Sequence, residues 1–108
     1  MSTFDDRERA FETKYARDQE MQFKIVARRN KLLGRWAAGL MGLSEAEAES
    51  YASDVIRADF EEAGDEDVIR KLIGDLTSAG VDIDDQRIRE AMEHKTVEAR
   101  RQLMEAQG

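Results

Sequence analysis

The chain has 108 residues, a net charge of −7 and 38% charged residues, with neither cysteine nor proline. This length predicts one domain with a modest core, and the absence of proline favours an all-α fold. Without cysteine there is no disulfide scaffold, thiolate nucleophile or cysteine-based metal site, and one histidine cannot build a histidine zinc site. The negative charge argues against nucleic-acid binding.

No targeting or membrane-spanning segment is expected. The first twenty residues carry six acidic and four basic side chains, where a secretory signal would need an apolar run. The longest stretch of low charge, residues 36–44, is far shorter than the roughly 20 residues that a spanning helix needs. We therefore expect a cytoplasmic protein that does not insert into the membrane.

Residues 1–20 form a segment of their own in this interpretation. On a helical wheel, Phe4, Phe11 and Tyr15 fall on one narrow seam, and most other side chains are charged or small. One seam of three residues cannot offset the entropy cost of ordering a whole helix. We therefore expect a flexible N-terminal segment that becomes helical against a partner, followed by a globular domain at 21–108.

The globular part is expected to be a small four-helix bundle. Apolar residues recur at helical spacing in 22–43, 44–63, 65–79 and from Asp82 or Asp84 onward. Gly42, Gly64 and Gly80 are expected to end the first three helices. The other boundary signals are a capping box at Ser44-Glu45-Ala46-Glu47 and an expected N-cap at Asp65.

Charge is distributed in blocks along the chain. Residues 21–43 hold five basic and no acidic side chains, whereas residues 44–63 hold seven acidic and one basic. This pattern would be explained by two helices of opposite net charge that pack side by side. The simpler interpretation is that both are solvated faces that keep the domain soluble.

A basic stripe runs along the helix expected at 22–43. It consists of Lys24, Arg28, Lys31 and Arg35, at spacings of four, three and four residues. Such a stripe could hold a phosphate or a nucleotide weakly, so a small nucleotide- or phosphate-sensing protein is the alternative function. Pairing with acidic neighbours, in this chain or on a partner, is the simpler interpretation.

Catalytic and metal-binding templates fail, so we expect neither an enzyme nor a cofactor or metal site. The glycines at 34, 39 and 42 lie in or at the end of an apolar helix, where close packing explains them. His94 is expected on a charged, solvated helix face. Asp82, Asp84 and Asp85 lack the glycine and distal glutamate of a calcium loop, so helix capping explains them better.

The whole chain resembles the zeta-subunit family of alphaproteobacterial F-type ATP synthases, which are small inhibitor proteins. The most specific stretches are FDDRERAFETKYARDQE at 4–20 and ARRNKLLGRWAAGLMGL at 27–43. The N-terminus alone is also similar to the inhibitory stretch of the mitochondrial ATPase inhibitor protein. The positions that match it are Phe4, Arg7, Glu8, Ala10, Glu12 and Tyr15.

The resemblance implies regulation of ATP hydrolysis. The N-terminal helix would insert between the alpha and beta subunits, near the gamma shaft, and block rotation in the hydrolysis direction at the cytoplasmic face of the membrane. The globular part would dock outside, and the free protein would be a monomer, because the dimer-forming helix of the mitochondrial protein has no counterpart. The implied partner-binding residues are Phe4, Arg7, Glu8, Ala10, Phe11, Glu12 and Tyr15.

Overall fold

The computed structural model describes residues 3–61 and 64–107, with side chains described for 18–59 and 64–106. Four helices follow one another: α1 (Thr3–Leu40), α2 (Glu45–Glu61), α3 (Asp65–Ser78) and α4 (Asp85–Gln107). The described residues contain no strand. The predicted all-α, four-helix class is therefore confirmed.

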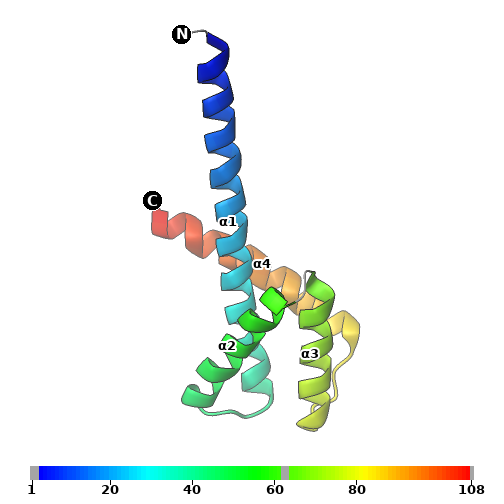
Figure 1. Ribbon diagram of the computed structural model, residues 1–108. Coiled ribbons are helices and arrows are strands. Elements are labelled where there is room, and N and C mark those ends of the chain that lie inside the picture. The colour runs from blue at the N-terminus through cyan, green and yellow to red at the C-terminus, as the bar shows by residue number, and fades with distance from the viewer. Residues whose placement is uncertain (1–2, 62–63, 108) are drawn as a thin grey trace.

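Helix α1 is much longer than the helix expected at 22–43. The second half of α1 packs against α2 and α4, whereas its first half extends beyond the other three helices (Figure 1). The chain has no proline, and its first glycine is Gly34, so nothing in residues 3–33 interrupts the helix. Residues 4–20 accordingly have a helical backbone here. That they become helical only on binding stays a prediction.

The predicted boundary between α1 and α2 is confirmed. Gly42 adopts a left-handed φ of 74°, and the Leu43 amide donates to the Ala38 carbonyl at 3.0 Å, which closes the end of α1. In the capping box, the Glu47 amide donates to Ser44 Oγ at 3.2 Å, and the Ser44 amide donates to Glu47 Oε1 at 3.1 Å. These bonds lower the pKa of Glu47.

The ends of α3 confirm one expectation and correct another. Gly80 has a φ of 81° and ends α3 as predicted. The N-cap of α3, however, is Gly64 rather than Asp65, and it makes no side-chain capping bond. Asp65 is already helical and pairs instead with Arg29, because a long-range partner outcompetes the local cap. The start of α4 is capped by Asp84, whose Oδ1 accepts from the Arg87 amide at 2.8 Å.

The core lies where the second half of α1 meets the other three helices. Trp36 and Tyr51 are half-buried at its edge, and Leu40, expected on the apolar arc of α1, is 44% exposed. Phe60, expected on the apolar face of α2, has a side chain outside the described residues. The core cluster consists of Leu33, Ala37, Val55, Val68, Ile69, Leu72, Leu76, Ile88, Ala91 and Met92.

The glycines of α1 serve different purposes. A β-carbon at Gly34 would lie 2.7 Å from the Ala52 Cα, so close packing explains this residue as expected. Gly39 has nothing within 4 Å of such a β-carbon, so for this residue the expectation was wrong. Its side faces open space at the solvent-exposed end of the helix.

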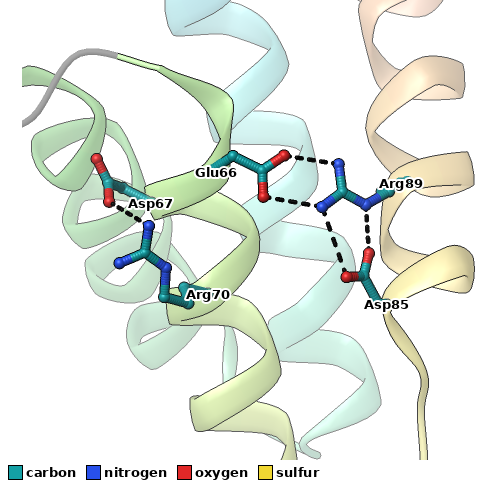
Figure 2. A network of polar contacts seen from close by, with 5 residues as sticks. All are labelled: Glu66, Asp67, Arg70, Asp85 and Arg89. Carbon is teal, nitrogen blue, oxygen red and sulfur yellow. Dashed lines mark hydrogen bonds and ion pairs between the residues drawn. The ribbon is translucent and has the colours of Figure 1, made fainter.

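Polar contacts also tie α3 to α4. Arg89 of α4 donates to both carboxylate oxygens of Glu66, each at 2.8 Å, and also pairs with Asp85 (Figure 2). The bond from Arg89 lowers the pKa of Glu66. Both groups are exposed, so we expect the pair to orient the two helices more than to stabilise them.

Candidate inhibitory helix and adjoining groove

The candidate inhibitory residues all belong to the first half of α1. The structure places the backbone of residues 4–15 in one uninterrupted helix, and their side chains lie outside the described residues. On a helix of 100° per residue, positions 4, 11 and 15 fall within about 40° of one another. The backbone thus puts the three aromatic positions on one face.

The basic stripe is engaged along most of its length by partners within the chain. Lys24 lies 3.5 Å from the Glu20 carboxylate, one turn earlier in α1. Arg28 donates to Gln102 of α4 at 3.2 Å, and Arg35 pairs with Glu49 of α2. No hydrogen bond or ion pair is found for the half-buried Lys31 among the described residues. The simpler interpretation of the stripe, pairing with acidic neighbours, is therefore supported for Lys24 and Arg35.

Arg29, next to the stripe, is buried. Its Nε and Nη2 donate to Asn30 Oδ1 at 3.1 and 3.0 Å, and Nη2 also donates to Asp65 Oδ1 at 3.0 Å. Asn30 is fully buried, and its Nδ2 has no hydrogen-bond partner within the described part of the chain. This polar cluster joins the middle of α1 to the first residue of α3.

A groove of about 710 Å³ opens above this cluster, in the range of pockets that hold ligands or partner side chains. α1 forms one wall and the C-terminal part of α2 the other, with Gly64 and Asp65 between them. Most of its exposed surface is apolar, but six polar side chains line it, and three of them are carboxylates. The lining residues are Asp18, Gln19, Gln22, Phe23, Val26, Ala27, Asn30, Ile56, Asp59, Gly64 and Asp65.

The groove begins where the candidate inhibitory segment ends. Asp18 is three residues beyond Tyr15, and Phe23 is eight residues beyond it, about 12 Å along a helix. Phe23 is 65% exposed. The groove and the candidate inhibitory segment therefore adjoin along α1.

From the sequence, Arg29 was grouped with Arg28 as a possible phosphate contact, and neither its burial, nor Asn30, nor the groove was predicted. A signal for Arg29 was present, because positions 25, 29, 33 and 37 are four residues apart, and the apolar members of this row are all buried. The carboxylate that makes burial of Arg29 possible lies 36 residues away, where no local pattern reaches. The groove was missed for the same reason, because it forms only where α2 packs antiparallel to α1 and brings residues distant in sequence together.

The described part of the chain offers neither a metal site nor a membrane-spanning helix. Within residues 3–61 and 64–107, no group of three or more histidine, cysteine, aspartate or glutamate side chains could hold a metal ion. No helix in the described part of the chain combines the length and the apolar character needed to cross a membrane. His94 is exposed on α4, as expected.

These features define a small all-α protein in which one long helix projects from a bundle (Figure 1). The sequence model for the family described as ATPase inhibitor subunit zeta matches residues 1–102, so the chain belongs to that family. A solution NMR structure is 48% identical to it, with a TM-score of 0.71 over 80% of this chain and 98% of that one. A search of curated proteins gives no match.

Proposed function

We propose that the chain inhibits ATP hydrolysis by the F-type ATP synthase through insertion of its N-terminal helix at a catalytic interface. Residues 1–20 would enter between an alpha and a beta subunit, near gamma, and block rotation in the hydrolysis direction. The bundle of residues 21–108 would remain outside. The observation that carries this proposal is the continuous α1, whose first half extends beyond the other helices (Figure 1).

The residue types of the segment suit such an interface. Phe4, Phe11 and Tyr15 would anchor in an apolar groove, because aromatic side chains dominate the free energy of many protein interfaces. Arg7, Glu8 and Glu12 would form charged pairs around them, and Ala10 would allow a close approach. The free protein would be a monomer at the cytoplasmic face of the membrane, and ATP synthase its partner.

Phosphate or nucleotide sensing is supported less well. It requires the basic stripe to present free cations, but Lys24, Arg28 and Arg35 already have partners within the chain. A phosphate would have to displace these partners. We therefore retain inhibition as the proposed function.

An ATPase assay of the host enzyme tests the proposal. The full chain should inhibit ATP hydrolysis, and a chain lacking residues 1–19 should not. The truncated chain should keep its stability in urea, because the core cluster uses no residue before Leu33. Inhibition by the truncated chain at the level of the full chain would contradict the proposal and would point to the bundle as the inhibitory element.

A further inference from the structure

Asp59 is a carboxylate in the groove whose charge is only partly compensated by the described residues. This half-buried residue of α2 lines the groove, and no ion pair is found for it among the residues that the structure describes. Burial raises the pKa of its carboxyl group, although the charge on Arg29 and the amide of Asn30 oppose that rise. Taking a carboxylate out of water costs free energy unless a cation or donor compensates it.

The two nearest donors, Arg29 and Asn30, supply that compensation only in part, because burial still raises the pKa of Asp59. Arg29 directs its hydrogen bonds to Asn30 and Asp65. The Asn30 side chain lowers the pKa of Asp59 as a hydrogen-bond donor, but the geometry of this contact leaves Nδ2 poorly satisfied. The groove thus holds a half-buried carboxylate without an ion pair and a buried amide whose Nδ2 is poorly satisfied.

The rest of the groove specifies the kind of group that would fit. Asp18 adds a second exposed carboxylate at the end of the groove nearest the N-terminal segment. Phe23, Val26 and Ile56 supply apolar walls. A lysine or arginine side chain matches this lining, because its apolar stem packs against such walls while its charged end reaches a carboxylate.

We propose that the groove binds a lysine or arginine side chain, with an apolar neighbour, from the ATP synthase surface at the mouth of the site that receives residues 1–20. This inference rests on the proposed function and adds a second contact to it. Continuity along α1 supports a protein occupant, because the groove starts three residues after Tyr15 on the same helix.

A matched pair of variants on α2 tests the charge. Asp59→Asn and Asp54→Asn make the same chemical change on one helix, but Asp54 is exposed and does not line the groove. Asp59→Asn should weaken binding of the full chain to the purified host synthase about fivefold, the scale of one partly solvated ion pair. Asp54→Asn should bind as the natural chain does and keep its melting temperature. Asp59→Asn removes a partly buried charge, so it should melt at the same temperature or higher.

A crosslinking experiment tests the occupant directly. The chain has no cysteine, so Ile56→Cys and Arg57→Cys each provide one site for a benzophenone label, inside the groove and on the exposed face beside it. In complex with the synthase, the label at position 56 should crosslink to a synthase peptide that contains lysine or arginine. The label at position 57 should give much less of this product.

The outcomes separate this inference from the proposed function. If both asparagine variants bind equally well, or if position 56 crosslinks only to a second copy of this chain, the groove inference is wrong. The proposed function would still stand, provided that removal of residues 1–19 abolishes inhibition. If the truncated chain inhibits fully, the proposed function fails, whatever the groove binds.

Discussion

Gly34 of α1 and Ala52 of α2 approach so closely that no side chain fits between them. A β-carbon at position 34 would lie 2.7 Å from the Ala52 Cα and 3.3 Å from Val55 Cγ2. The obstacle at position 52 is backbone, which cannot rotate away. This contact sets how closely the two helices with opposite charge blocks pack.

We therefore expect Gly34→Ala to destabilise the fold by about 1–3 kcal/mol, the usual cost of overpacking a core. Gly39→Ala is the matched control in the same helix, because its β-carbon would meet nothing within 4 Å. That change should stabilise the protein by about 0.5–1 kcal/mol through helix propensity. Urea unfolding measures both, and equal effects would show that Gly34 is not a packing residue.

The buried Arg29 gives a second prediction. Arg29→Ala removes its bonds to Asn30 and Asp65 and leaves a buried amide oxygen without its donor. We expect a loss of about 2–3 kcal/mol in urea unfolding. Arg70→Ala is the control, because the Arg70 side chain is 74% exposed where it pairs with Asp67, and it should cost about 0.5 kcal/mol or less. A similar small loss for Arg29→Ala would mean that the buried cluster contributes nothing net.

Tyr51 should make stability depend on pH in the alkaline range. Burial raises the pKa of its phenol, and the hydroxyl also donates to Asp75 Oδ2 at 2.7 Å. The unfolded chain therefore loses this proton first, so the free energy of unfolding should fall as pH rises above about 10. Tyr51→Phe should show a shallower fall in the same titration. An identical slope in both proteins would exclude Tyr51 as its source.

The proposed insertion predicts a separate effect for a helix-breaking change. Ala16→Pro removes a backbone donor, and its ring clashes with the carbonyl of Glu12 four residues earlier, at a cost of about 3 kcal/mol or more in a helix. Inhibition should weaken strongly, whereas the melting temperature of the bundle should hold. Ala16→Ser is the control and should inhibit almost as well as the natural chain. Full inhibition by the proline variant would show that a continuous helix is not required.

Local signals predicted the fold well, and long-range partners explain what they missed. Gly42, Gly80 and the capping box of Ser44 and Glu47 act within one helical turn, so their residue types suffice to place helix ends. Asp65 has the composition of an N-cap but pairs with Arg29 in another helix. The continuous α1 was not predicted, because the narrow apolar seam of residues 1–20 was used to judge helix formation. Such a seam indicates how little tertiary packing stabilises a helix, and it does not decide whether the backbone is helical.

For the site, the sequence provided the inhibitory segment only through its resemblance to known inhibitors. The pattern of aromatic positions 4, 11 and 15 agrees with one helix face, but nothing local identifies what that face binds. The groove could not be predicted, because Asp59 and Phe23 become neighbours of one cavity only after α2 has folded back along α1.

In the proposed insertion, the continuous α1 would fix how far the N-terminal helix enters and which way its aromatic positions face. A single helix is about 10–12 Å across, whereas the molecule measures 28 × 22 Å perpendicular to its long axis. A binding site that is wide enough for the projecting helix alone would therefore exclude the bundle. Removing two residues between Tyr15 and Phe23 would turn the aromatic anchors by about 200° relative to the bundle. Removing seven residues would shorten the projecting helix by about 10 Å but leave the aromatic positions facing within about 20° of their present direction. The number of residues in that stretch thus sets both the length of the projecting helix and the direction in which the aromatic positions face.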